Sequence, residues 1–381
     1  MRIVIAGGGT AGHVYPGLAV GRELRARGAE VSFLGTETGV EARLVPTAGF
    51  PFQVLRARPF VRRVSISAVR APFVALDAVR ECRPIVAGAD AVVGMGGYVS
   101  VPAVLAARRE RVPALLHEQN AVAGLANGAL AKARAARVVA LSFRDTKGSW
   151  PRAVRTAVTG NPVRDEILRV PDEREALAKE ARAELELDDH RRTVLVFGGS
   201  QGALHIDRAA IGACRLLGDR VDLQIVMVTG TAHLDIIRRG LWAKDRPDRV
   251  VSVAGGPDGL IVRLIGYLDR MDLGYACADL VVARAGATTV AEISVCGLPS
   301  LLIPYPYATR RHQEANARAM QRAGAASLLL DDQVSAQILA DRIVSLTDHD
   351  DRLEAMRERS RAFGKPDAAL RLADLVAAVA S

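Results

Sequence analysis

The 381-residue sequence predicts an α/β protein with two doubly wound, Rossmann-like domains that face a central cleft. First, apolar β-type runs alternate with helical patterns along the chain, as in parallel sheets covered by helices. Second, a chain of this length exceeds the size at which a single core keeps growing, so two domains are expected. Third, two glycine-rich loops, 7–12 and 198–203, each follow an apolar run and open a helical pattern, about half a chain apart.

The expected strands fall into two groups along the chain. Those of the first half are Ile3–Ala6, Glu30–Leu34, Ala91–Val93, Ala114–His117 and Val138–Leu141. Those of the second half are Thr193–Phe197, Gln224–Thr229, Val250–Val253, Leu280–Ala283, Ser300–Pro304 and Ala326–Leu330. A charged, helix-prone stretch, 172–189, precedes the second group. Each group therefore predicts one parallel sheet of its own.

The boundary between the two domains is expected near Asn161. The tail carries an apolar stripe at helical spacing, which we expect to return to the first domain; its residues are Leu372, Leu375, Val376 and Val379. The first domain is thus predicted to comprise residues 1–162 plus 365–381, and the second residues 163–364.

Composition narrows the function classes. The net charge of +9 suits nucleic acid, an anionic membrane surface or phosphorylated substrates. No RNP-like aromatic motif or zinc finger accompanies it, so we expect no nucleic-acid partner. The four cysteines form no C-x-x-C pair, which argues against a zinc site or a disulfide scaffold and fits a reducing cytoplasm. A strand is expected directly after Met1, with no room before it for a secretion signal, so we expect none.

Residues 91–107 carry no charge, which raises the alternative of a transmembrane helix. Gly94, Gly96, Gly97 and Pro102 interrupt this segment, and it is slightly short for a span. We therefore expect a strand, a glycine loop and then a buried helix.

The first glycine-rich loop matches the dinucleotide fingerprint G-x-G-x-x-G at Gly7, Gly9 and Gly12. A dinucleotide enzyme also needs an acidic residue at the end of the second strand to bind the ribose. The chain reads Leu34-Gly35-Thr36 there and Glu37 comes late, so the dinucleotide interpretation is disfavoured.

Polar groups gather after three strands of the first half. His13 follows the first loop at the start of a helix, where the dipole lowers the pKa of an imidazole; it is either a general base or a helix cap. The loop 94–100 either lines the same cleft or makes a tight turn. The run 117–120 (His-Glu-Gln-Asn) ends another strand, where open α/β sheets bind ligands.

In the second half, residues 283–292 again read as a strand, a small-residue loop and a helix start. The free N–H groups of such a helix suit a diphosphate. Glu292 lies in the first turns of this helix, where its carboxylate either accepts both hydroxyls of a ribose or only complements the helix dipole.

Taken together, these motifs resemble those of the MurG family of GT-B glycosyltransferases, over essentially the whole chain. The matching segments, in the order of the family, are 8–13 (GGTAGH), 96–100 (GGYVS), 117–120 (HEQN), 160–164 (GNPVR), 198–203 (GGSQGA) and 284–287 (RAGA). Three positions depart from the family pattern: Ala11, Val101 and His312. Val101 lies beside a loop that faces the acceptor in the family. The geometry of acceptor binding is therefore the property that the resemblance supports least for this chain.

The resemblance implies roles for individual residues. The UDP diphosphate and ribose would be held by Ser200, Ala287, Thr288, Thr289, Val290, Ala291 and Glu292, with Glu292 on the ribose. Arg164 and Leu268 would frame the uracil, while Asn120 and Gln313 would contact the N-acetylglucosamine. Thr10, Ala11, Gly12 and His13 would approach the reacting carbon. His13 would then be the general base, and Glu118 is a second catalytic candidate.

The resemblance also implies the reaction. The C4 hydroxyl of undecaprenyl-pyrophosphoryl-MurNAc-pentapeptide would attack the anomeric carbon of UDP-GlcNAc with inversion, a step of peptidoglycan synthesis. Helix N-termini would stabilise the departing diphosphate, so no cofactor and no metal is expected, and no D-x-D motif lies near these loops. Such an enzyme works as a peripheral protein at the cytoplasmic face of the bacterial cell membrane.

A lipid-linked acceptor requires a surface that contacts the membrane. The stretch 56–73 interleaves basic and apolar side chains, which suits anionic headgroups and shallow insertion, although its apolar positions could equally face the core. The candidate membrane contacts are Phe60, Arg62, Arg63, Ile66, Arg70 and Phe73.

Two other functions remain open at this point. A different GT-B enzyme could use a nucleotide sugar with another lipid acceptor, and it would differ only in its acceptor pocket. A non-catalytic UDP-sugar-binding protein would bind the donor without needing His13.

Overall fold

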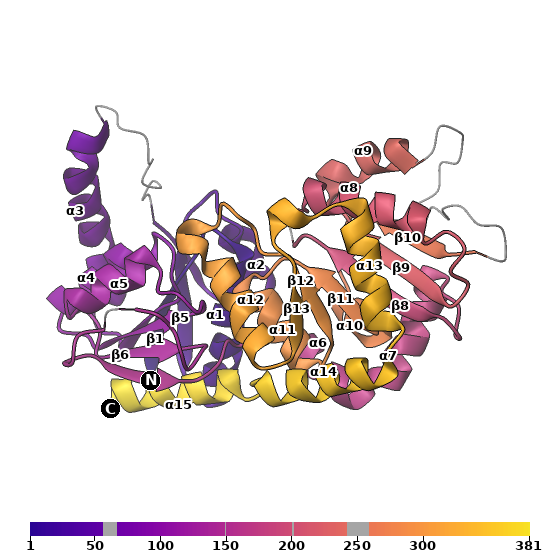
Figure 1. Cartoon of the computed structure of the whole chain (residues 1–381). Coiled ribbons are helices and arrows are strands. Elements are labelled where there is room, and N and C mark those ends of the chain that lie inside the picture. Colours follow the sequence, from indigo (N-terminus) through magenta and orange to yellow (C-terminus); the bar gives the residue numbers. More distant parts are fainter. Residues whose placement is uncertain (56–66, 149, 200–201, 242–258) are drawn as a thin grey trace. The chain divides into compact units, whose positions relative to one another are not determined.

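The computed structural model describes residues 1–55, 67–148, 150–199, 202–241 and 259–381, with only the backbone described at 67–75 and 240–241. The chain divides into two compact units (Figure 1). The N-terminal unit comprises Met1–Arg164 and Lys365–Ser381, and the C-terminal unit comprises Asp165–Gly364. The division falls two residues after the boundary expected from the sequence.

The N-terminal unit is built on a parallel sheet, which in the described residues has seven strands in the order β3-β2-β1-β4-β5-β6-β7. Its elements are β1 (Arg2–Ala6), α1 (Ala11–Ala26), β2 (Glu30–Gly35), α2 (Glu41–Thr47), β3 (Phe52–Val54), α3 (Ser67–Val86), β4 (Ala91–Gly94), α4 (Ser100–Arg109), β5 (Ala114–Glu118), α5 (Leu125–Lys132), β6 (Val138–Leu141), β7 (Arg155–Val158) and, after the other unit, α15 (Ala368–Ala380). The strand order reverses between β1 and β4, where doubly wound sheets bind ligands.

Both faces of this sheet are covered, so its strands are apolar on both sides. Ile3 and Ile5 of β1 belong to a core that includes Leu372 and Val376 of α15. The alternate residues, Val4 and Ala6, belong to a second core with residues of α3 and α4. This alternation is the period of two that a strand imposes. The apolar stripe of the tail is therefore buried on the first sheet.

The C-terminal unit has a second parallel sheet, with six described strands in the order β10-β9-β8-β11-β12-β13. Its elements are α6 (Asp165–Leu168), α7 (Val170–Leu185), β8 (Arg192–Phe197), α8 (Leu204–Leu216), β9 (Leu223–Val228), α9 (Thr231–Leu241), β10 (Ile261–Ile265), α10 (Met271–Cys277), β11 (Leu280–Ala283), α11 (Ala287–Val295), β12 (Ser300–Leu302), η1 (Thr309–Arg311), α12 (His312–Arg322), β13 (Ala326–Leu328), η2 (Asp331–Gln333), α13 (Ala336–Thr347) and α14 (Asp350–Phe363). The order reverses between β8 and β11, as it does between β1 and β4 in the first sheet.

The prediction of two Rossmann-like α/β domains is confirmed, and most expected strands lie within one or two residues of their predicted bounds. Three strands were not predicted: β3, β7 and β10. The expected strand Val250–Val253 lies outside the described residues. The uncharged segment 91–107 forms β4 and α4, so the strand-loop-helix interpretation is correct. Across the described residues, every helix is too short or too polar to cross a membrane.

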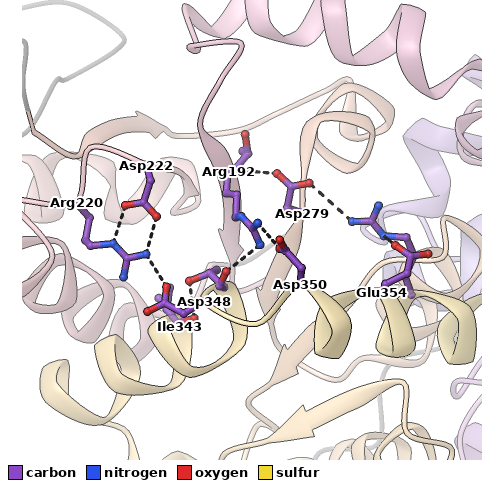
Figure 2. A network of polar contacts seen from close by, with 11 residues as sticks. Arg192, Arg220, Asp222, Asp279, Ile343, Asp348, Asp350 and Glu354 are labelled. Carbon is purple, nitrogen blue, oxygen red and sulfur yellow. Dashed lines mark hydrogen bonds and ion pairs between the residues drawn. The ribbon is translucent and has the colours of Figure 1, made fainter.

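A network of charged side chains holds the amino ends of β8 and β11 to α13 and α14 (Figure 2). Arg220 donates to both carboxylate oxygens of Asp222, at 2.7 and 2.6 Å, and to Asp348 at 2.6 Å. Hydrogen bonding to Arg220 lowers the pKa of the Asp222 carboxyl. Asp279, just before β11, accepts from the backbone N–H of Thr193 at 3.0 Å. Ligands bind such sheets at the carboxyl ends of the strands. This network lies at the opposite edge of the sheet and is therefore structural.

Candidate active site

The first glycine-rich loop connects β1 to α1 and places His13 in the first turn of that helix. Thr10 is the residue before the helix, with extended backbone angles. The Nδ1 atom of His13 lies 3.2 Å from the carbonyl oxygen of Gly8 and 3.1 Å from Oγ1 of Thr10. Because a carbonyl only accepts hydrogen bonds, we assign the proton to Nδ1. Nε2 is then the nitrogen of the neutral ring that can take up a proton.

The loop after β4 packs directly against His13. Gly96 and Gly97 have positive φ angles of 94° and 78°. A Cβ atom on Gly96 would lie 3.0 Å from Cδ2 of His13, and one on Gly97 would lie 2.6 Å from the carbonyl oxygen of Gly8. Both positions therefore require glycine, for conformation and for space. The loop thus packs against the candidate base.

The strand β5 ends in the run 117–120. His117 is fully buried, and its Nε2 lies 3.0 Å from the carbonyl oxygen of Gly160. Burial lowers the pKa of His117 to about 4, the hydrogen bond to Gly160 opposes this effect, and the charge of His13 adds to it. His117 is therefore neutral around pH 7.

Glu118 orders the loop that carries Asn120. Glu118 is 1% exposed. One carboxylate oxygen accepts from the backbone N–H of Asn120 at 3.1 Å and from its side-chain amide at 3.3 Å. The other accepts from the N–H of Gly124 at 2.8 Å and from the amide of Asn127 at 2.9 Å. The carboxylate thus holds the half-buried Asn120 at the edge of the sheet. Asn127 is one of the residues that sequence reasoning missed.

In the C-terminal unit, the loop after β8 has no room for a side chain at Gly202. The φ angle there is 70°, and a Cβ atom would lie 2.0 Å from the carbonyl oxygen of Thr229 and 2.8 Å from Nδ1 of His233. Asp207, 1% exposed in α8, lies 3.4 Å from that Nδ1 atom. Burial raises the pKa of the Asp207 carboxyl, and His233 opposes the change. The sequence did not reveal this pair, and Ser200 lies outside the described residues.

The N-terminus of α11 is built for an anion. Its preceding residue is Gly286, which has extended backbone angles and no side chain to cap the helix, and its first turn is free of acidic residues. Ala287, Thr288 and Thr289 are half-buried. The buried Oγ1 of Thr288 has no hydrogen-bond partner among the described residues. N–H groups, helix dipole and hydroxyl together suit a phosphate.

Glu292 follows one turn later on α11 and is 5% exposed, whereas Val290 beside it belongs to the core. The hydroxyl of the fully buried Tyr275, on α10, donates to Oε2 of Glu292 at 3.0 Å. Leu268 is 7% exposed and packs against α10 at Gly274. Tyr275, which sequence reasoning missed, therefore fixes the orientation of Glu292, the residue predicted to bind the ribose.

Two buried side chains hold the loop between β11 and α11. Arg284 donates to the carbonyl oxygens of Ile303 and Pro304 at 3.2 and 3.1 Å. Asn316 of α12, also missed by sequence reasoning, donates to the carbonyl oxygen of Ala285 at 3.1 Å. Gln313 is the second residue of the same helix, and its side-chain oxygen accepts from the N–H of Tyr305 at 2.9 Å. Gln313, the predicted sugar ligand, thus lies at the carboxyl end of β12.

Arg164 and the candidate membrane contacts complete the set of predicted site residues. The guanidinium of Arg164 lies 4.8 Å from the ring centroid of Tyr15, and both residues belong to the N-terminal unit. Of the candidate membrane contacts, Phe60, Arg62, Arg63 and Ile66 lie outside the described residues. Arg70 and Phe73 lie on α3, where only the backbone is described. In the described ranges no group of three His, Cys, Asp or Glu side chains could hold a metal ion.

Comparison with known proteins identifies the family. Residues 3–139 match the glycosyltransferase family 28 N-terminal domain, and residues 193–372 match the glycosyltransferase family 28 C-terminal domain. The chain is 38% identical to the UDP-N-acetylglucosamine–N-acetylmuramyl-(pentapeptide) pyrophosphoryl-undecaprenol N-acetylglucosamine transferase of Halothermothrix orenii, over 99% of this chain and 98% of that protein. It is 37% identical to the protein of the same name from Bacillus subtilis, over 98% of each.

Solved structures agree with the sequence comparison. The crystal structure of Acinetobacter baumannii MurG matches with a TM-score of 0.76 and 31% identity, over 99% of each chain. A UDP-GlcNAc 2-epimerase from Neisseria meningitidis shares the fold, with a TM-score of 0.67 at 15% identity, over 99% of this chain and 100% of that one. The chain therefore belongs to the MurG family and is a glycosyltransferase with the two Rossmann-like domains of the GT-B fold.

Proposed function

We propose that this enzyme transfers N-acetylglucosamine from UDP-GlcNAc to the C4 hydroxyl of undecaprenyl-pyrophosphoryl-MurNAc-pentapeptide, as a step of peptidoglycan synthesis. The main support is that relatives named for this reaction align with the chain from end to end at 37–38% identity. The geometry of His13, with Nδ1 hydrogen-bonded to the protein, gives the first unit a base that this reaction can use.

In the proposed mechanism, Nε2 of His13 removes the proton of the acceptor hydroxyl as its oxygen attacks the anomeric carbon. The new carbon–oxygen bond forms on the face opposite the departing UDP, so the configuration inverts. The bond between the anomeric carbon and the diphosphate oxygen breaks, and UDP leaves with the electron pair.

The residues of the second unit would bind the donor. The N–H groups of Ala287, Thr288 and Thr289 would face the diphosphate, where fixed dipoles stabilise the charge that develops on departure. Glu292, held by Tyr275, would accept hydrogen bonds from the ribose hydroxyls. Leu268 and Arg164 would frame the uracil, and Ser200 and Gln313 would complete the donor contacts.

Asn120 would contact the transferred sugar from the first unit, while Glu118 orders its loop. The lipid tail of the acceptor requires a membrane, and the basic and apolar stretch 56–73 suits an anionic surface. We therefore place the enzyme peripherally at the cytoplasmic face of the bacterial cell membrane.

The test is a product assay. The purified enzyme, given UDP-GlcNAc and the pyrophosphoryl-linked MurNAc-pentapeptide acceptor, is expected to release UDP and form the disaccharide, as measured by mass spectrometry. His13→Ala should lower kcat by about a hundred- to ten-thousand-fold while leaving the calorimetric affinity for UDP unchanged.

Absence of the disaccharide with the wild-type enzyme would refute the acceptor assignment. A product formed only with other lipid acceptors would identify a different GT-B lipid glycosyltransferase. An unaffected His13→Ala variant would remove His13 from the mechanism.

A further inference from the structure

A buried carboxylate lies behind the first glycine-rich loop. Glu41 is the first residue of α2 and is fully buried. Its Oε2 accepts from the backbone N–H of Gly9 at 3.0 Å. Its Oε1 accepts from the backbone N–H of Thr36 at 3.0 Å and from the hydroxyl of Thr36 at 2.8 Å. Each of these contacts is a donation to the carboxylate, so Glu41 acts purely as an acceptor in them.

Three glycines make room for this side chain. A Cβ atom on Gly8 would lie 2.2 Å from Oε1 of Glu41, one on Gly39 would lie 2.1 Å from the same atom, and one on Gly35 would lie 2.4 Å from Cγ. None of these three glycines has a positive φ angle, so the need is for space rather than conformation. The backbone is thus shaped around one carboxylate at three points.

Glu41 and His13 contact the two ends of the same peptide group. The N–H of Gly9 donates to Glu41, and the carbonyl of Gly8, in the same peptide, accepts from Nδ1 of His13 at 3.2 Å. In a trans peptide these two groups point in opposite directions. Hydrogen bonds in such a chain polarise one another, so a carboxylate at one end makes the carbonyl at the other end a stronger acceptor.

We propose that Glu41 is the positioning residue of His13, acting through the Gly8–Gly9 peptide. It holds the ring with its proton on Nδ1, and it stabilises the imidazolium that forms when Nε2 takes the proton of the acceptor hydroxyl. This role rests on the proposed function, in which His13 is the base. The same contact withdraws the N–H of Gly9 from phosphate binding, for which loops of this type are otherwise used.

Other titratable groups at this edge do not replace Glu41. His117, on β5, has a pKa of about 4, which keeps it neutral over the range of an activity assay. Tyr98, in the loop after β4, donates its hydroxyl to Oγ1 of Thr36 at 3.2 Å, and Thr36 in turn donates the same hydroxyl to Oε1 of Glu41. Glu41 is therefore the carboxylate that the described contacts connect to the base.

The test is the Glu41→Gln variant. Glutamine is uncharged and has a single oxygen, so it cannot accept from both Gly9 and Thr36. We expect the midpoint of the acid limb of the kcat/KM profile to move about 0.5 to 1 pH unit toward acid, because a nearby negative charge favours the protonated imidazole. The plateau of kcat should fall about ten- to a hundred-fold. A purely structural role would lower the plateau without moving the midpoint.

The same shift is measured directly by NMR titration of the His13 ring, identified by the signal that His13→Ala removes. This measurement needs no acceptor and no product, so it stands even if the product assay fails. The matched control is Glu37→Gln, which removes the same charge from an exposed position four residues away and should leave the midpoint in place.

A His13 midpoint in Glu41→Gln that equals the wild-type value, or lies above it, would overturn the proposal. If this variant does not fold, Glu41→Asp keeps the charge but withdraws it from Gly9. Its midpoint is expected to move toward acid by a smaller amount, and an unmoved midpoint would again contradict the role of Glu41.

Discussion

At the scale of single residues, His117 makes the stability of the N-terminal unit depend on pH. Its pKa is about 4 in the folded chain, against an ordinary value of 6.5, because the ring is buried. Between these values the unfolded chain binds a proton that the folded chain does not, so stability is fully present above pH 6.5 and falls as the pH drops to 4. The loss amounts to about 3 kcal/mol over that window.

His117→Gln should remove this dependence, because the glutamine amide can still donate to the carbonyl of Gly160 but does not titrate. Urea unfolding measures the free energy of unfolding of the variant and the wild type at pH 7 and at pH 4. Between these pH values the wild type is expected to lose about 3 kcal/mol more than the variant. The exposed His349 provides the control, since His349→Gln should change nothing. Equal pH dependence in the variant and the wild type would disprove the role of His117.

The sequence identified His13 because it directly follows a glycine-rich loop, but it gave no sign of Glu41. Glu41 lies 28 residues after His13 in the sequence. It reaches the loop only because β2 pairs with β1, so that α2, which follows β2, begins beside the carboxyl end of β1. The fingerprint Gly7-Gly9-Gly12 is typical of loops whose free N–H groups bind phosphate, and nothing in its spacing indicates that one of these groups is already occupied. A buried internal carboxylate takes the N–H of Gly9, and such pairings depend on tertiary structure rather than on spacing.

At the scale of elements, the hydrogen bond from Tyr275 to Glu292 joins α10 to α11 at the position where the ribose is predicted to bind. Glu292→Ala should weaken UDP binding by about 1 to 3 kcal/mol, because charged hydrogen bonds to the ribose are lost. Tyr275→Phe keeps the ring and removes only the hydroxyl, so it should weaken binding by about 0.5 to 1.5 kcal/mol. Calorimetry measures both values, and unchanged affinity in Glu292→Ala would exclude the ribose role.

Central strands were predicted well, and the three strands that were missed all lie at sheet edges, although the edge strand β13 was predicted. β1, β4 and β8 are buried on both faces and give continuous apolar runs, as parallel strands do. β3 has three residues, and β7 carries an exposed arginine, so neither gives a clear pattern. β10 interrupts its apolar run with Arg263, whose guanidinium donates to the carbonyl oxygens of Leu185 and Glu186.

At the scale of the whole molecule, the chain returns to its first unit at the end, and α15 completes a core that begins with β1. Leu372 is fully buried in this core. Leu372→Ala should therefore lower the free energy of unfolding of the N-terminal unit by about 2 to 5 kcal/mol, through lost burial and the cavity that remains. The affinity for UDP should not change, because α11 and Glu292 belong to the other unit.

Leu370→Ala is the matched control on the same helix, since Leu370 is 48% exposed and its loss should cost less than about 0.5 kcal/mol. Urea unfolding measures the stability of both variants, and calorimetry at a temperature where both are folded measures UDP binding. If Leu372→Ala weakened UDP binding while the fold remained intact, the last helix would also support the donor site, and the division of labour between the two units would be wrong.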